Sequence, residues 1–319
     1  ELTATNELLT AEVAERKHLE KINVKGLDIQ KTINSILSIA LETSPLDTRL
    51  DKILHLILSL EWLSFESMGC IFLADGETLR MNAHYGLPKE NLLLCENVPL
   101  GKCVCGMAAA RGKLVFKDGL DENHETIYDG IVNHGHYCVP IMHGSKNLGI
   151  LNLYVKEGHK QKDEEVNFLN NVANTMAGII LRNKDEEEII NNYLIQHVLS
   201  QILRLSVEAL SLKEQLQKTL DIISNVSWLS SSSTGCIFLV EDNPDILVMK
   251  AHRGISLELF NTCSYLPMGK CLCGRAAQTG ETIFKSSLDE HHQIRYEGMI
   301  NHGHYCVPIK SKDKVLGVI

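Results

Sequence analysis

The feature that most constrains this chain is an internal repeat. Residues 36–50 (ILSIALETSPLDTRL) align with residues 202–216 (ILRLSVEALSLKEQL) at an offset of 166. Residues 99–141 align with residues 267–309 at an offset of 168, and 26 of those 43 positions are identical. A repeat with the length of an ordinary domain predicts one fold built twice, rather than a single large core.

Identity between the two copies is concentrated around cysteine and histidine. All 10 cysteines have a partner in the other copy, whereas exposed loops have drifted. The matched positions are Cys70/Cys236, Cys95/Cys263, Cys103/Cys271, Cys105/Cys273, Cys138/Cys306, His84/His252, His124/His292, His134/His302 and His136/His304. Duplication alone does not place identity at these residue types, so we expect them to share a chemical role.

Composition excludes several classes of protein. A net charge of −9 argues against a general nucleic-acid binder, which needs clustered lysine and arginine. No stretch approaches 18 apolar residues, and the polar, acidic N-terminus is unlike a signal peptide. We therefore expect a cytoplasmic protein without a membrane segment. In that reducing compartment the cysteines are metal ligands, redox sensors or buried apolar residues rather than a disulfide framework.

Hydrophobic periodicity predicts an α+β unit used twice. Leu2, Leu9 and Val13 are spaced like a coiled-coil seam, which predicts an N-terminal signalling helix over residues 1–27 that Gly26 interrupts. Pro45 predicts a helix break. Residues 69–74, 78–85, 136–142 and 148–155 are typical of strands, the first two forming a hairpin, and 106–112 of a short helix.

A single long helix is predicted to join the two copies. Apolar residues recur at helical spacing from Phe168 to Ile202 without a break signal. The resulting domains are residues 28–187 and 188–319, each an antiparallel sheet flanked by helices. The second copy stops within the strand LGVI, so we expect the sequence to be a fragment of a longer protein.

This order of elements resembles the GAF domain of signalling proteins. The resemblance rests on GCIFL, on P-(L/M)-G-x-C-x-C-G, and on VPI followed by LGILNLY and a long helix, and it covers both copies. It implies helices on one sheet face that pack a homodimer. It also implies a pocket on the other face, roofed by the Cys-x-Cys-Gly turn. The N-terminal segment resembles linker helices of bacterial histidine kinases and diguanylate cyclases.

The cysteines and histidines suggest a metal centre in each copy. On a strand, His134, His136 and Cys138 point one way and Tyr137 the other. Cys103 and Cys105 share a face if their turn is extended, and a helix start favours a thiolate at Cys105. The predicted ligands are Cys103, Cys105, His136 and Cys138, and Cys271, Cys273, His304 and Cys306 in the second copy. Cys95 and His134 are further candidates.

Three thiolates and one imidazole suit zinc, mononuclear iron or an iron–sulfur cluster. We also predict a ligand pocket in each copy, bordered by His134 and Tyr137 in the first and by His302 and Tyr305 in the second. The alternatives are a metal-free thiol switch and a purely structural role for the cysteines. We expect the structural role for Cys70 and Cys236.

The expected function is a sensory input module that responds to redox state, oxygen or nitric oxide and signals through its helices. A small-organic-ligand domain and a dimerisation scaffold are the alternatives. There is no P-loop, nucleophile elbow, kinase or cyclase motif, so we expect no enzyme here. One catalytic alternative remains, because some GAF-like proteins reduce methionine sulfoxide with pocket cysteines. The lack of Cys-x-x-Cys-His argues against c-type haem. Because Val139, not histidine, follows Cys138, a bilin photoreceptor is not expected.

Overall fold

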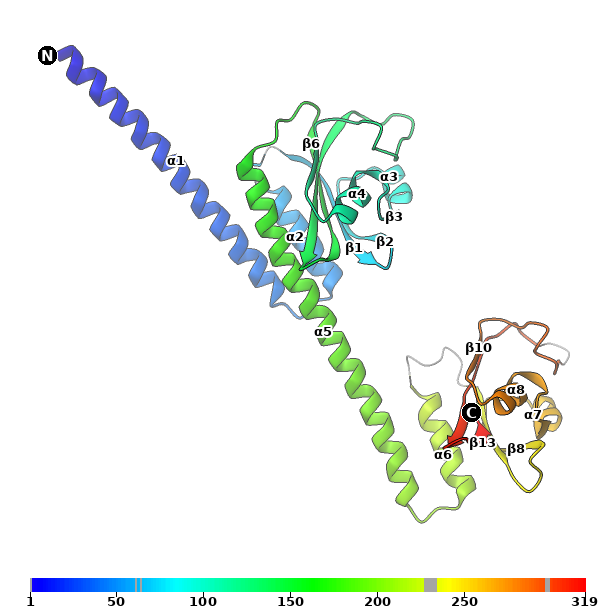
Figure 1. Cartoon of the computed structure of the whole chain (residues 1–319). Coiled ribbons are helices and arrows are strands. Elements are labelled where there is room, and N and C mark those ends of the chain that lie inside the picture. The colour runs from blue at the N-terminus through cyan, green and yellow to red at the C-terminus, as the bar shows by residue number, and fades with distance from the viewer. Residues whose placement is uncertain (1, 61, 64, 227–233, 296–298) are drawn as a thin grey trace. The chain divides into compact units, whose positions relative to one another are not determined.

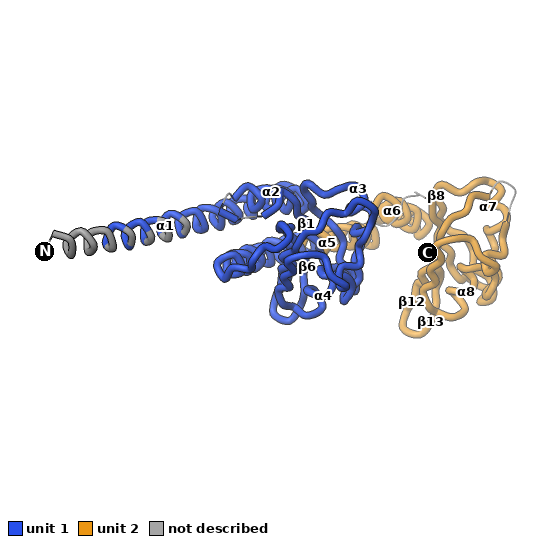
Figure 2. Tube along the Cα trace, turned by 90° about the horizontal axis from the view of Figure 1, so that it is seen from above, with its two compact units in different colours: residues 1–188 blue, residues 189–319 orange. Residues whose placement is uncertain are grey.

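The computed structural model describes residues 2–60, 62–63, 65–226, 234–295 and 299–319. The chain divides into two compact units, residues 1–188 and 189–319 (Figure 2). The first unit contains helices α1 (Leu2–Ala40), α2 (Leu46–Leu58), α3 (Lys89–Leu94) and α4 (Cys103–Arg111), with the strands β1 (Phe65–Asp75), β2 (Thr78–Tyr85), β3 (Asn97–Pro99), β4 (Val115–Lys117), β5 (His134–His143) and β6 (Lys146–Lys156) (Figure 1). Helix α5 (Asp163–Val207) begins in this unit and continues into the second.

The first unit is one antiparallel sheet with a helical layer on each face. Its six strands run in the order β3-β2-β1-β6-β5-β4. Helices α1, α2 and the start of α5 cover one face, where Ile36, Ile53 and Phe168 meet the sheet residues Ile71 and Leu151 in a buried aliphatic core. Burying these apolar side chains supplies the main driving force for folding.

Helix α4 covers the opposite face. Its residues Val104, Cys105 and Ala108 pack against Cys70 and Cys138 of the sheet. The short segment that follows β4 and leads into β5 lies on this side as well (Figure 1). The sheet therefore separates a helical face from a face that carries the cysteines.

The second unit repeats this plan with shorter strands. It contains α6 (Leu212–Ser224), α7 (Leu257–Cys263), α8 (Cys271–Thr279), β7 (Gly235–Val240), β8 (Ile246–Arg253), β9 (Tyr265–Pro267), β10 (Ile283–Lys285), β11 (His304–Cys306), β12 (Pro308–Ser311) and β13 (Lys314–Val318). Its described strands form a five-stranded sheet, β12-β13-β7-β8-β9, and the pair β10-β11. The α+β prediction of two antiparallel sheets flanked by helices is confirmed.

Several local predictions can be compared with the structure. The helix break at Pro45, the hairpin between β1 and β2 and the continuous helix from Phe168 to Ile202 are confirmed. The interruption at Gly26 is wrong, because α1 runs through it. A glycine in an exposed helix costs only about 1 kcal/mol relative to alanine, which neighbouring turns can absorb. The side chains of Leu2 and Leu9 lie outside the described residues. Of the described helices, none is both long and apolar enough to cross a membrane.

Candidate functional site

Strand β5 distributes its side chains to the two faces of the sheet. Cys138 lies in the core under α4, and the Oδ1 atom of Asn152 on β6 accepts hydrogen bonds from both Cys138 and His136. Tyr137 lies in the helical-face core with α2 and α5. The predicted alternation of His136 and Cys138 against Tyr137 is therefore confirmed. It also removes Tyr137 from the cysteine face, where the predicted ligand pocket was placed.

Three buried histidines meet at the start of β5. His124, His134 and His136 are 6%, 8% and 2% exposed, and one ring nitrogen of each lies within 4.8 Å of the other two. The ring centroids are 5.5, 5.1 and 4.7 Å apart. We call this group the first triad. Among the described residues, the only other His, Cys, Asp or Glu group of this kind is His292, His302 and His304, the second triad.

A turn before β5 carries His124 into the triad. The amide of His124 donates to the carbonyl of Asp121 at 3.0 Å, and Lys117 forms an ion pair with the Asp121 carboxylate. Asn133 closes the loop, since its Oδ1 accepts from the amide of Leu120 at 2.7 Å. These side-chain bonds replace backbone pairing in the segment between β4 and β5.

Steric crowding requires glycine at position 135, between the two strand histidines. A Cβ on Gly135 would clash with the carbonyl oxygen of Lys117 and lie 2.8 Å from Val155 Cγ2. Only glycine lets β4 approach the start of β5 this closely. The His-Gly-His sequence therefore places two imidazoles on one face while β4 passes beside them.

Hydrogen bonds set the tautomers of the two strand histidines. Nδ1 of His134 lies 2.6 Å from the carbonyl oxygen of Val132, and Nδ1 of His136 lies 3.1 Å from Oδ1 of Asn152. Because both oxygens accept, each Nδ1 carries the proton and each Nε2 keeps a lone pair. Nε2 of His134, Nε2 of His136 and Nδ1 of His124 are buried and have no hydrogen-bond partner.

Burial favours the neutral form of His136 and His124. Desolvation, with the neighbouring His134 and His124, lowers the pKa of His136 to about 3. Desolvation and His134 also lower the pKa of His124. A neutral imidazole is the form that coordinates metal. Such strong perturbation at clustered groups is typical of functional sites.

The cysteines form a pair beside the triad rather than a four-ligand site with His136. Sγ of Cys105 lies 3.5 Å from Sγ of Cys138, and Asn152 donates to Cys70 at 3.6 Å. The predicted group of Cys103, Cys105, His136 and Cys138 does not converge, since no described cysteine belongs to a three-ligand cluster. Both cysteines of the pair are free thiols.

Helix geometry explains why Cys103 separates from Cys105. Cys103 is the first residue of α4 and has a left-handed backbone with a φ of 51°, so the segment from Cys103 to Cys105 is not extended and its side chains do not share a face as they would on a strand. The extended turn expected there is wrong. The expected thiolate at Cys105 is wrong too, because its hydrogen bond with Cys138 and its burial raise the pKa well above the usual value. Cys95 packs at the edge of the same cluster, with its Sγ 3.3 Å from the Thr126 hydroxyl.

On the other face of β5, Tyr137 reaches the start of the long helix. Its hydroxyl donates to Oε2 of Glu165 at 2.8 Å, and Glu165 is only 2% exposed. His159 and Lys162 contact the same carboxylate at 2.8 and 3.0 Å. Burial raises the pKa of Glu165, but these three hydrogen bonds outweigh it and leave the pKa below its usual value. The carboxylate thus ties β5 to the first turn of α5.

The second copy repeats the histidine and cysteine geometry. The centroids of His292, His302 and His304 are 5.5, 4.9 and 4.6 Å apart, and Sγ of Cys273 lies 3.5 Å from Sγ of Cys306. His302 Nδ1 lies 2.6 Å from the Ile300 carbonyl oxygen, as in the first copy. The predicted set of three cysteines and one histidine, Cys271, Cys273, His304 and Cys306, is likewise not among the ligand clusters of the described residues. Tyr305, a predicted pocket residue, is 62% exposed and stacks on Phe284.

Sequence reasoning found two members of each triad and missed the third. His134, His136, His302 and His304 were candidates, whereas His124 and His292 were noted only as matched positions. The identity of Leu-Asp-Glu-x-His in both copies was the available signal. Asn152 and Glu165 were also missed, because only the pairing of β5 with β6 and with α5 brings them to the site.

The fold agrees with a comparison to known families. A family model described as the GAF domain matches residues 43–181 and again residues 209–319. The two matches cover well over half of the chain, which therefore belongs to the GAF domain family. GAF domains are general sensory or ligand-binding modules. No curated protein matches the sequence.

Solved structures with a similar fold include two GAF domains of phosphotransferases and a free methionine-R-sulfoxide reductase. The GAF domain of the Acinetobacter phosphoenolpyruvate-protein phosphotransferase is 17% identical, with 51% of this chain and 96% of that chain covered at a TM-score of 0.43. The corresponding domain from Coxiella burnetii is 18% identical, with 51% and 98% covered and a TM-score of 0.44. The free methionine-R-sulfoxide reductase from Neisseria meningitidis is 15% identical, with 50% and 91% covered and a TM-score of 0.42.

Proposed function

We propose that this chain is the sensory input part of a cytoplasmic signalling protein of the histidine kinase or diguanylate cyclase type. Each GAF domain receives a chemical signal at its cysteine and histidine face and passes it to a helix. Redox state, oxygen and nitric oxide are the signals that such side chains read.

The observation that carries this proposal is the two-sided role of β5. His136 and Cys138 stand on one face, and the residue between them, Tyr137, is hydrogen-bonded to Glu165 of α5 on the other. A shift of β5 caused by chemistry on the first face must stretch or move the buried bond on the second. Packed cores respond to such shifts by discrete rearrangement rather than by gradual deformation.

Hydrogen exchange tests this coupling. Anaerobic protein is exposed separately to diamide, to dioxygen and to a nitric oxide donor, and amide exchange is followed over residues 163–181. We expect at least one treatment to change exchange there, and Tyr137→Phe to reduce the change. Leu257→Ala is the control, because Leu257 is exposed on α7. If none of the three treatments alters α5, the sensory proposal is wrong.

We also propose that the chain is regulatory rather than catalytic. The pKa of Cys105 is raised by its bond to Cys138 and by burial, and burial raises the pKa of Cys95 to about 11. Both therefore stay in the poorly nucleophilic thiol form at neutral pH. A methionine sulfoxide reduction assay with thiol recycling should show no turnover. Reduction of one or more molecules of methionine sulfoxide per chain would favour a reductase.

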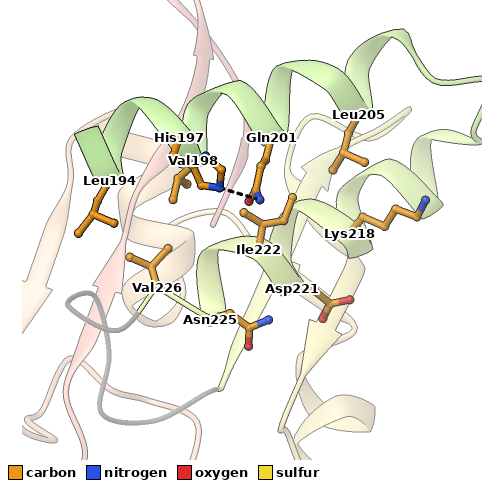
Figure 3. A pocket seen from close by; sticks show the side chains of 10 residues that line it. All are labelled: Leu194, His197, Val198, Gln201, Leu205, Lys218, Asp221, Ile222, Asn225 and Val226. Carbon is orange, nitrogen blue, oxygen red and sulfur yellow. Dashed lines mark hydrogen bonds between the residues drawn. The ribbon is translucent and has the colours of Figure 1, made fainter. Parts of the chain in front are cut away.

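The helices supply a surface for the homodimer that we propose. In the second unit, a groove of about 610 Å³ between α5 and α6 is lined by Leu194, Val198, Leu205 and Ile222, with Asp221 at its side (Figure 3). An equivalent groove of about 620 Å³ lies between α1 and α2 of the first unit.

The groove occupies the same place in both repeats. We propose that a second copy of this chain covers it, because a two-fold contact places the same surface of each partner against the other. Light scattering should report a dimer, and Ile222→Glu should weaken it. Leu257→Glu, which adds the same charge to an exposed position, should not. A monomer at high concentration would contradict the proposal.

A further inference from the structure

We infer that each histidine triad is a binding site for a divalent transition-metal ion, held by three imidazoles and leaving a coordination position open. This inference deepens the proposed sensory function, because it names the centre that would receive the signal. It stands on the geometry of the triads and uses none of the cysteines.

The unpartnered nitrogens are the first argument. Burying a polar atom without a hydrogen bond is unfavourable, because the atom loses its bonds to water. The first triad contains three such ring nitrogens, on His124, His134 and His136, and the second triad contains two at equivalent positions, on His292 and His304. Repetition of this unfavourable arrangement at one place in both copies indicates that the lone pairs serve a ligand.

The space between the three histidine nitrogens is close to the size of a metal site. Three atoms that lie within 4.8 Å of one another are all within about 2.8 Å of a common point (4.8 Å divided by √3). Imidazole nitrogens bind zinc at about 2.0–2.1 Å, so side-chain movements of less than about 1 Å complete the site.

The hydrogen bonds behind the ligands are the third argument. A metal-binding histidine usually donates its other ring N–H to a carbonyl or carboxylate, which fixes the ring and its tautomer. His134 does so to Val132, His136 to Asn152 and His302 to Ile300. These bonds are present without any ion and prepare Nε2 for coordination.

The ligand set indicates the class of ion. Imidazole suits Zn²⁺, Fe²⁺, Ni²⁺ and Cu²⁺, whereas Ca²⁺ and Mg²⁺ require oxygen ligands that the triads do not offer. Three protein ligands with a free position are typical of metal sites that bind or activate a small molecule, while structural zinc sites use four. The centre is therefore suited to reading an exogenous small ligand.

Cobalt(II) gives a direct test, because its visible spectrum reports low coordination number and its near-ultraviolet spectrum reports thiolate ligands. The reduced, metal-free 319-residue chain is titrated with Co²⁺, and the bound ion is counted by equilibrium dialysis. We expect about two Co²⁺ per chain and no thiolate charge-transfer absorption.

Variants assign the sites. His124→Ala should leave one Co²⁺ per chain, and His124→Ala with His292→Ala should leave none. His84→Ala with His252→Ala, a matched pair that belongs to neither triad, should keep both ions, and so should Cys105→Ser with Cys138→Ser. Two ions bound by the double triad variant, or no binding by the unaltered chain, would overturn the inference.

X-ray absorption of the loaded, unaltered chain keeps the test independent of folding in the variants. Nitrogen neighbours without sulfur support the triads, and sulfur neighbours contradict them. Failure here is distinguishable from failure of the sensory proposal. A chain that binds no Co²⁺ but changes exchange in α5 with diamide would retain the sensory function and lose the metal.

Discussion

The two GAF domains share their histidine triads but not what surrounds them. The three ring distances agree within 0.2 Å between copies. In the first domain β5 is continuous over His134–His143, whereas the second has β11 (His304–Cys306) and β12 (Pro308–Ser311) in its place. Asn152 and Tyr154 of β6 contact the first triad.

This difference teaches that the triad is a local construction. The turn at Asp121, the loop closure by Asn133 and the His-Gly-His strand recur as Asp289, Asn301 and residues 302–304, with the corresponding hydrogen bonds. These short-range bonds suffice to place three imidazoles. The rest of the first domain supplies burial, one additional hydrogen bond to His136, and the connection to α5.

The largest expected effect concerns the connection between β5 and α5. Tyr137→Phe removes a hydrogen bond to the buried carboxylate of Glu165 and should cost about 1.5–3 kcal/mol of local stability. Tyr305→Phe changes a residue that is 62% exposed and should cost little. Hydrogen exchange of β5 and β11 measures both. Equal losses would show that the Glu165 network is not what distinguishes the domains.

Metal affinity should also separate the domains. Asn152 orients His136 in the first triad, and loss of such a supporting bond typically weakens metal binding about 10–100-fold. Asn152→Ala should therefore weaken one class of Co²⁺ site and leave the other unchanged. A uniform loss at both sites, or none, would mean that the loop bonds alone determine affinity.

Acid should destabilise the metal-free first domain through His136. An unfolded histidine takes up its proton near pH 6.5, whereas the folded pKa of His136 is about 3, so the folded state binds fewer protons in between. Stability is thus full above pH 6.5 and falls as pH falls toward 3, by about 1 kcal/mol between pH 7 and 5.5.

His136→Gln should remove that part of the pH dependence in denaturant titrations performed in chelator. Burial also lowers the folded pKa of His304, to about 4, which is a smaller shift than that of His136. Protonation of His304 therefore destabilises the fold in the same direction, but the loss of stability levels off near pH 4 rather than near pH 3. An unchanged pH profile in His136→Gln would show that other groups govern the acid transition.

The smallest effect should be equal in both copies. Cys103 and Cys271 begin α4 and α8 with φ of 51° and 57°, a left-handed conformation that costs about 1–2 kcal/mol for a side-chain-bearing residue. Cys103→Gly and Cys271→Gly should each recover up to about 1 kcal/mol, since glycine adopts this conformation freely but loses more entropy on folding. Destabilisation in either case would indicate that the thiol makes a contact that outweighs the strain.

Much of the fold was predictable because its signals are local. Helical periodicity, Pro45 and the internal repeat led to the α+β tandem, and strand alternation placed Cys138 and Tyr137 on opposite faces. The site was predicted less well. The assumption that Cys103 and Cys105 lie on an extended turn led to a sulfur-ligated metal. The predicted helix began at residue 106, whereas α4 begins at Cys103 and includes both cysteines. His124 sits in a loop without periodicity, and only the tertiary path of residues 118–133 brings it to His134.

The most direct test of the account is hydrogen exchange of α5 with and without Zn²⁺. The central claim is that β5 links a metal-binding face to the long helix through Tyr137 and Glu165. We predict that Zn²⁺ changes exchange over residues 163–181 in the unaltered chain. Tyr137→Phe should still bind the ion but should not transmit the change. Full occupancy of the first triad with no change in α5 would contradict the claim.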